Sequence, residues 1–192
     1  AQAALDRALA TISGSYDRLI KKEKMTAEQK AAALGRIKTA TDLAALKDAD
    51  LVIEAATENL DLKLKIFRQL DELAKADAVI ASNTSSISIT KLAASTKRPD
   101  KVIGMHFFNP VPVMKLVEVV RHPTADAEAV ACAVALAERM GKTPITVTDS
   151  PGFASSRLGL VIGLEAMRMV EQGVASPDDI DTTSDLQRAE ES

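Results

Sequence analysis

The segment at residues 78–120, AVIASNTSSISITKLAASTKRPDKVIGMHFFNPVPVMKLVEVV, decides the fold of this chain. It contains three short apolar runs rich in β-branched residues, at 78–81, 101–105 and 116–120. Runs of this kind predict buried strands. Patterns typical of strands and of helices alternate between residues 51 and 149, which favours an α/β fold built on a parallel sheet.

Polar residues follow the first two of these strands, at positions where a buried core would not select them. Asn83 and Ser85 follow the first strand, His106 and Asn109 follow the second, and Glu118 lies inside the third. Open parallel sheets bind their ligands beyond the carboxyl ends of the strands. A hydroxyl, an imidazole and a carboxylate at three such places indicate a proton-transfer site.

The remaining elements are predicted from apolar periodicity and capping residues. Thr26 and Gln29 form a capping box at the start of one helix. Residues 36–41 fit either a short strand or an extended link. Helices are also expected at 3–22, 57–76, 88–95, 125–140, after the SPGF turn at 150–153 and from Ser176, and strands at 51–56 and 144–149. Everything after residue 150 is expected to be helical, so we place a domain boundary at 149–152.

Composition excludes several classes of partner. The net charge is −3, with basic and acidic residues interleaved, which argues against nucleic acid. The longest apolar stretch, LGLVIGLEAM at 158–167, is too short to span a bilayer, and the start lacks a secretory signal. We therefore expect a cytoplasmic protein without a membrane partner. The single cysteine, Cys132, is expected to be a buried, inert thiol.

Both ends of the sequence are unusual. The first residue is alanine and the chain begins within a helical pattern, whereas the last residues, TTSDLQRAEES, are polar and complete no element. From these ends we expect an incomplete chain.

Four segments carry a resemblance to a known family: ASNTSSISIT, GMHFFNPVPVMKLVEVV, GKTPITVTDSPGF and GVASPDDIDT. Together they resemble 3-hydroxyacyl-CoA dehydrogenases, including 3-hydroxybutyryl-CoA dehydrogenases. The resemblance implies a Rossmann-type NAD-binding domain at 1–149 and, at 150–192, the start of a helical domain that contributes to a homodimer. It also implies that the family's first two strands, with their G-x-G-x-x-G turn, are lacking here, because the eight glycines contain no such triple.

The implied reaction is the reversible oxidation of a 3-hydroxyacyl-CoA to a 3-ketoacyl-CoA, in fatty-acid β-oxidation or in butyrate or polyhydroxybutyrate metabolism. The alcohol needs a base as its hydride passes to NAD, and histidine titrates in the useful range. The chain has two histidines, and His122 precedes a proline in a predicted loop. The resemblance therefore implies His106 as the base, with Glu118 bonded to its imidazole. An isolated histidine is more often structural, and Glu118 alone could be a surface carboxylate, but its apolar neighbours predict burial.

The resemblance implies roles for four more residues near this pair. Ser85 matches a serine that hydrogen-bonds the substrate oxygen, although SNTSS is also good turn chemistry. Asn109 matches a residue near the nicotinamide, and Glu58 one beside the cofactor. Lys63 matches a residue that reaches both cofactor and CoA; read alone, it is a helix-surface charge.

Three further substrate contacts are implied with less support from the residues themselves. Ser15 and Lys22, on the first helix, resemble positions that contact CoA. The family motif PGF-x-x-NR places asparagine near the thioester carbonyl, whereas this chain has Ser156 there. Serine reaches less far, so we expect weaker polarisation of the carbonyl.

Two other functions stay open. A non-catalytic fragment that binds acyl-CoA or a partner subunit would explain why no phosphate-binding glycine turn is found. A Rossmann oxidoreductase acting on free 3-hydroxy acids is the other; many of those use a lysine base and lack the HFFNP pattern.

Overall fold

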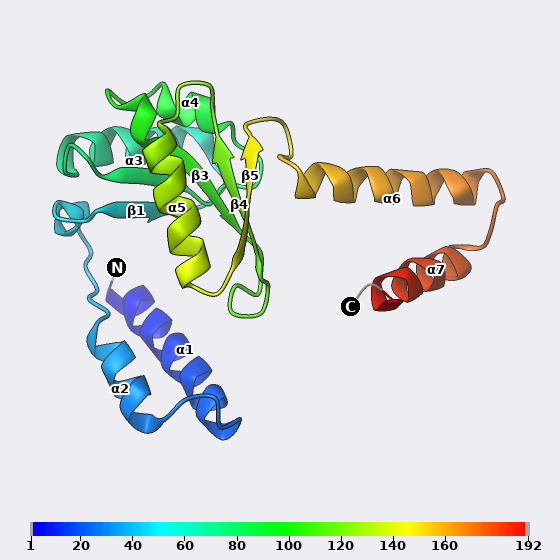
Figure 1. Cartoon of the computed structure of the whole chain (residues 1–192), viewed down its shortest axis with the longest axis horizontal. Helices are drawn as coiled ribbons and strands as arrows, with labels where there is room; N and C mark the ends of the chain where they lie inside the picture. The colour runs from blue at the N-terminus through cyan, green and yellow to red at the C-terminus, as the bar shows by residue number, and fades with distance from the viewer. Residues whose placement is uncertain (1, 191–192) are drawn as a thin grey trace. The chain divides into compact units, whose positions relative to one another are not determined.

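The computed structural model describes residues 2–190, which form two compact units (Figure 1). The first unit comprises the chain up to Ala49 together with Leu73–Lys75. The second comprises Asp50–Glu72 and the chain from Ala76 onward. The five-stranded sheet belongs to the second unit.

The first unit is helical. It contains α1 (Gln2–Lys21), α2 (Ala27–Gly35) and a short 3₁₀ helix, η1 (Leu43–Leu46). The predicted capping box is confirmed: the Gln29 backbone N–H donates to Thr26 Oγ1 (3.2 Å), and the Thr26 N–H donates to Gln29 Oε1 (2.9 Å). Residues 37–40 form neither helix nor strand, so the segment expected at 36–41 is a link rather than a strand.

The second unit is built on one sheet whose strands lie in chain order, β1-β2-β3-β4-β5. Its strands are β1 (Leu51–Glu54), β2 (Val79–Ser82), β3 (Val102–Phe107), β4 (Leu116–Arg121) and β5 (Thr143–Thr148). Three neighbouring pairs are parallel, but β4 runs antiparallel to β3. The predicted parallel sheet is thus confirmed for three strand pairs, and this junction is its one exception. A parallel pair needs a crossover of about a dozen residues or more, usually a helix, and the link at 108–115 is too short for one.

Helices cover both faces of the sheet. Helix α5 (Ala127–Arg139) packs on one face and lies in front of the strands in Figure 1. Its contacts form a core of alternating strand residues and small helix residues: Val79, Ala81, Ile103, Met105, Val119, Ala129 and Ala133. Helices α3 (Leu60–Leu73) and α4 (Ile89–Ala93) bury Phe67, Leu70, Ile89 and Leu92. The α/β class predicted from the sequence is confirmed.

Helix α5 also corrects one prediction. Ala129, Ala133 and Ala137 recur at four-residue spacing and are buried. Cys132 precedes one of them, about 100° round the helix, and is exposed rather than buried. The small alanines, and not the cysteine, face the sheet.

Strands β3 and β4 approach closely at Gly104, which lies opposite Val120 in the register. A Cβ atom at residue 104 would lie 2.7 Å from Val120 Cβ and 3.1 Å from Ile89 Cδ1. The even-numbered residues of both strands therefore face α4. His106 and Glu118 are the next opposed pair along that face.

Two helices end the described chain: α6 (Ser155–Glu171) and α7 (Pro177–Glu190). Ser176 caps α7 by accepting the Asp179 N–H (3.2 Å), as predicted. Residues 191–192 of the predicted helical region lie outside the described residues. Among the helices that the structure describes, none is long and apolar enough to cross a membrane.

Candidate active site

The centre of the site is a cross-strand pair. His106 is near the carboxyl end of β3, and Glu118, near the start of the antiparallel β4, lies directly opposite it. His106 Nδ1 lies 2.8 Å from Glu118 Oε2. Both residues are buried, with 5% and 0% of their surfaces exposed. The antiparallel hairpin, and not two parallel strand ends, brings the imidazole and the carboxylate together.

Glu118 accepts hydrogen bonds from other groups in addition to the histidine. Its Oε1 accepts the backbone N–H groups of Ala154 (3.0 Å) and Ser155 (2.9 Å), and its Oε2 accepts the Ser155 hydroxyl (2.8 Å). Burial raises the pKa of the Glu118 carboxyl, but the hydrogen bonds from His106, Ser155 and Ala154 outweigh burial and hold that pKa below its usual value. The carboxylate is therefore ionised and only accepts, which assigns the hydrogen of the imidazole to Nδ1.

The donors at Ala154 and Ser155 come from a strained turn ahead of α6. Gly152 (φ +75°) and Phe153 (φ +46°) are both left-handed, and α6 begins two residues later. The first N–H groups of a helix have no partner within it and favour an anion. A Cβ at Gly152 would lie 3.1 Å from the Arg157 nitrogen, so the turn also needs a glycine for space. Phe153 is buried, with its ring centroid 5.8 Å from that of His106.

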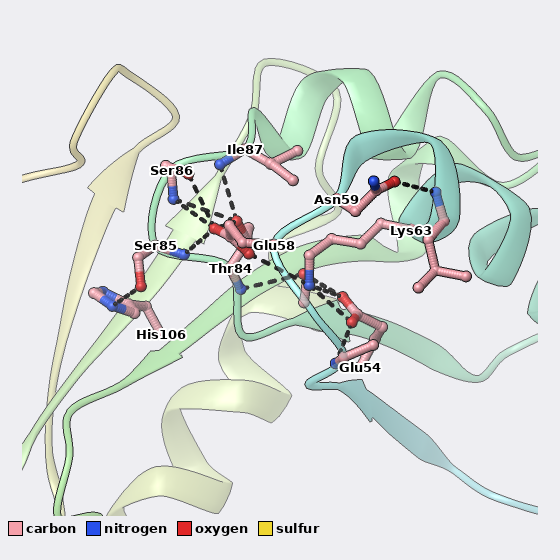
Figure 2. A network of polar contacts seen from close by, with 12 residues as sticks. Glu54, Glu58, Asn59, Lys63, Thr84, Ser85, Ser86, Ile87 and His106 are labelled. Atoms are coloured by element: carbon pink, nitrogen blue, oxygen red, sulfur yellow. Dashed lines mark hydrogen bonds and ion pairs between the residues drawn. The ribbon is translucent and has the colours of Figure 1, made fainter.

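The other imidazole nitrogen faces the loop after β2. His106 Nε2 lies 3.0 Å from Ser85 Oγ (Figure 2). Asn83 fixes this loop to β3 because its Oδ1 accepts the Phe107 N–H (2.8 Å). The structure thus brings Ser85, His106 and Glu118 into one hydrogen-bonded chain.

Glu58 accepts several hydrogen bonds from the same loop. Its Oε1 accepts the N–H groups of Ser85 (2.9 Å) and Ser86 (3.1 Å), the Ser86 hydroxyl (3.0 Å) and the Thr84 hydroxyl (Figure 2). Partial burial raises the pKa of Glu58, but these hydrogen bonds, led by that of Thr84, outweigh it and keep the pKa below its ordinary value. Glu58 is therefore an anion that orders the loop carrying Ser85.

Lys63 lies inside the protein. Its Nζ is 2.8 Å from both Glu54 carboxylate oxygens and 3.6 Å from Glu58 Oε2, and 1% of its side chain is exposed (Figure 2). Ser82 donates a further hydrogen bond to Glu54 (2.7 Å). The reading of Lys63 as a helix-surface charge is wrong, because the buried carboxylate at the end of β1 requires a cation.

The other predicted residues lie apart from this chain of contacts. Asn109 is exposed in the loop after β3. Ser156 is half-buried in the first turn of α6, but Ser155 is the serine bonded to Glu118. Ser15, which donates to the Thr11 carbonyl (3.0 Å), and the exposed Lys22 belong to the first compact unit. Their proposed contacts with CoA stay predictions.

His122 has a structural environment, as its loop position suggested. It is 4% exposed, and its Nε2 lies 3.0 Å from the Pro99 carbonyl and 2.9 Å from the Val102 carbonyl. These contacts join the start of β3 to the end of β4.

A cavity of about 490 Å³ borders the serine loop. Its lining includes Ser86, Lys91 and Asp149. Asp149 accepts hydrogen bonds from Ser88 Oγ (2.8 Å) and from the Thr90 N–H (2.8 Å) and hydroxyl (2.5 Å), which fixes α4 to the end of β5. In the described residues, no group of three or more His, Cys, Asp or Glu side chains is placed to hold a metal ion.

Sequence reasoning assigned no role to four groups that build this site: Glu54, Thr84, Asp149 and Ser155. A carboxylate at a strand end, as at Glu54, was visible in LVIEAA. The serine in PGFASSR was visible too, but its contact with Glu118 depends on how the turn enters α6. That geometry follows only from the folded structure.

Comparison with known proteins adds independent information. Residues 1–150 match the family model described as 3-hydroxyacyl-CoA dehydrogenase, NAD binding domain. Residues 152–187 match the model described as 3-hydroxyacyl-CoA dehydrogenase, C-terminal domain.

Individual relatives agree with these matches. The chain is 43% identical over 185 residues to a 3-hydroxybutyryl-CoA dehydrogenase of Clostridioides difficile, covering 96% of this chain and 66% of that protein. It is 45% identical over 154 residues to the human mitochondrial hydroxyacyl-coenzyme A dehydrogenase, covering 80% and 49%. The crystal structure of an (S)-3-hydroxybutyryl-CoA dehydrogenase from Ralstonia eutropha superposes with a TM-score of 0.89 and 53% identity, covering 93% and 63%. The chain spans between about half and two thirds of the length of these relatives.

Proposed function

This chain belongs to the 3-hydroxyacyl-CoA dehydrogenase family, and from that premise we propose that its protein oxidises a 3-hydroxyacyl-CoA to the 3-ketoacyl-CoA with NAD, reversibly. The observation that carries the proposal is the hydrogen-bonded chain from Ser85 through His106 to Glu118, with steps of 3.0 and 2.8 Å. A buried base with an ionised partner at one end and a hydroxyl at the other suits proton removal from an alcohol.

The proposed mechanism assigns one task to each residue. His106 Nε2 accepts the proton of the substrate's 3-hydroxyl, and the negative charge of Glu118 stabilises the imidazolium that results. Ser85 is proposed to hydrogen-bond the substrate oxygen. Its hydroxyl lies within hydrogen-bonding distance of His106 Nε2, so an oxygen bound beside it would also be within reach of the base. Bound NAD, with Glu58 and Asn109 beside it, would supply the hydride acceptor. The burial of His106 keeps competing water from the base.

The residues present fit the reactive end of NAD. Glu58 and Asn109 lie on loops that follow β1 and β3, beyond the carboxyl ends of those strands, where Rossmann-type sheets bind nucleotides. Glu58 is an ionised acceptor that also orders the Ser85 loop. The pyrophosphate requires the backbone N–H groups of a glycine-rich turn, and the eight glycines contain no such triple. The positions of Glu58 and Asn109 support the proposal that these residues would lie beside the nicotinamide end of the cofactor.

The finer assignments belong to the same proposal. Ser15, Lys22 and Lys63 are proposed to contact CoA, and Ser156 to lie near the thioester carbonyl. We place the protein in β-oxidation, butyrate or polyhydroxybutyrate metabolism and propose a homodimer. The proposed domain division is 1–149 for the cofactor and 150–192 for the start of the helical domain. Lys63 is buried in an ion pair with Glu54, so it would have to leave this ion pair to contact CoA.

One observation favours a second function. The absence of G-x-G-x-x-G from these residues suits a module that binds acyl-CoA without holding NAD. Such a module would retain the fold and show no hydride transfer.

An assay at the NADH absorbance band separates the two functions. With acetoacetyl-CoA as substrate, the full-length protein is expected to oxidise NADH at a rate proportional to enzyme concentration. Saturable binding of acetoacetyl-CoA without NADH oxidation would instead establish the binding module and overturn the proposed reaction.

A further inference from the structure

We propose that Ser155 is a positioning residue that sets the proton affinity of His106 through the carboxylate of Glu118. The inference rests on the proposed function, because it concerns the same base. It adds a residue that the family motif leaves free: in PGF-x-x-NR, Ser155 occupies the second x and Ser156 the place of asparagine.

The Ser155 hydroxyl contacts the same oxygen of Glu118 as the imidazole does. Glu118 Oε2 lies 2.8 Å from His106 Nδ1 and accepts the Ser155 hydroxyl, also at 2.8 Å. The other oxygen, Oε1, accepts the N–H groups of Ala154 and Ser155. Ser155 is thus the only residue in the described chain that donates to both oxygens of Glu118. Its hydroxyl competes with the imidazole for one of them.

The competition has a definite sign. A hydroxyl donor withdraws negative charge from Oε2, so the carboxylate attracts the imidazolium less strongly. Removal of the hydroxyl leaves more negative charge on Oε2, beside His106 Nδ1, and makes the imidazolium easier to form. The two backbone donors stay in place, so the carboxylate remains ionised and the pair keeps its geometry.

Other charged groups on the surrounding elements do not compete for these atoms. They are Glu58 ahead of α3, Lys91 on α4, Asp149 ahead of α6 and Arg157 on α6. Glu58 accepts hydrogen bonds from the loop after β2, and Asp149 accepts one from Thr90 in α4. None of the four makes a hydrogen bond or ion pair with His106 or Glu118 in the described part of the chain. A change in the titration of His106 on mutation of Ser155 therefore reports the hydroxyl.

The test compares Ser155→Ala, Ser155→Thr and Ser156→Ala in the full-length protein. The first readout is NMR titration of the His106 ring, with His106→Gln to assign its signals. Ser155→Ala is expected to move the midpoint of the ring titration to higher pH by roughly 0.5 to 1 unit, because part of the effect of one hydrogen bond to the carboxylate reaches the imidazole. Ser155→Thr keeps a hydroxyl and is expected to restore the wild-type value. Ser156→Ala serves as the neighbouring control for the titration alone.

The second readout is the pH dependence of kcat/KM in both directions. Oxidation needs a neutral imidazole, so its acid limb moves to higher pH in Ser155→Ala. Reduction needs the imidazolium, so its basic limb moves to higher pH as well. A merely structural role would lower rates without moving both limbs the same way.

The outcomes are distinct. Equal imidazole pKa values in wild type and Ser155→Ala, or an equal shift in Ser156→Ala, would overturn the inference. If the full-length protein lacked dehydrogenase activity, the proposed function would fail, but the NMR titration would still decide the role of Ser155.

Discussion

Glu118 is the most constrained residue of the site, since its carboxylate is fully buried and accepts hydrogen bonds from two elements, β3 and the start of α6. This arrangement gives Glu118 a role in stability beside its proposed role in the chemistry. An acid whose folded pKa lies below its unfolded value stabilises the fold wherever it is ionised.

The first prediction concerns acid stability. The folded pKa of Glu118 lies below 4.5, its ordinary value, so the unfolded chain binds the proton more readily between the two values. The stabilisation is therefore complete above 4.5 and is lost as pH falls through the folded pKa. Denaturant unfolding at a series of pH values should show a shallower acid loss in Glu118→Gln than in wild type. Parallel curves would show that another carboxylate is responsible.

Lys63 gives a second prediction at this scale. Removing one partner of a buried ion pair leaves an uncompensated charge, so Lys63→Met is expected to lower the free energy of unfolding by about 3 to 5 kcal/mol. The exposed Lys65, two residues along the same helix, provides the control, and Lys65→Met should change that free energy by less than ~0.5 kcal/mol. Urea denaturation measures both. Equal small effects would mean that Lys63 is solvated and free to reach a ligand.

Single residues were predictable where the family motif fixes them. HFFNPVPVMKLVEVV pointed to His106 and Glu118, and the hairpin brings them together. The burial of Lys63 and the contact of Ser155 were not predictable, because each depends on how a turn joins two elements: nine residues separate Lys63 from Glu54, and 37 separate Ser155 from Glu118.

At the scale of elements, the hairpin between β3 and β4 explains the site. Apolar runs and caps predicted the strands and helices, but the alternation of strands and helices favoured a parallel sheet and gave no sign that β4 runs antiparallel to β3. The length of the link at 108–115 carried the missing information, since it leaves no room for a crossover helix.

Gly104 provides the test of this hairpin. A Cβ at residue 104 would meet Val120 Cβ at 2.7 Å, so Gly104→Ala must push β3 from β4 or from α4. Overpacking of this kind is expected to cost about 1 to 3 kcal/mol of stability and to weaken the His106–Glu118 contact. Gly159, in α6, has nothing within 4 Å of its Cβ position, so Gly159→Ala should be neutral or stabilising. Thermal unfolding of the two variants decides, and equal melting temperatures would contradict the close packing.

At the scale of the whole molecule, the family assignment and the extent of the chain bear on cofactor binding. The chain spans 66% of its Clostridioides difficile relative and contains the polar edge of the sheet without a G-x-G-x-x-G turn. Because no glycine-rich phosphate turn is found in these residues, we expect NAD to produce little thermal stabilisation of the 192-residue chain. A saturable shift in the 192-residue chain would show that these residues hold the whole cofactor.

The central claim is that His106 removes the proton of a thioester-bound alcohol. The most direct measurement is the kcat of the full-length His106→Gln variant for NAD reduction with 3-hydroxybutyryl-CoA, alongside its affinity for acetoacetyl-CoA. The account predicts a loss of roughly 10²- to 10⁴-fold in kcat with affinity retained, because general base catalysis contributes on that order. A kcat close to wild type would contradict the assignment of the base.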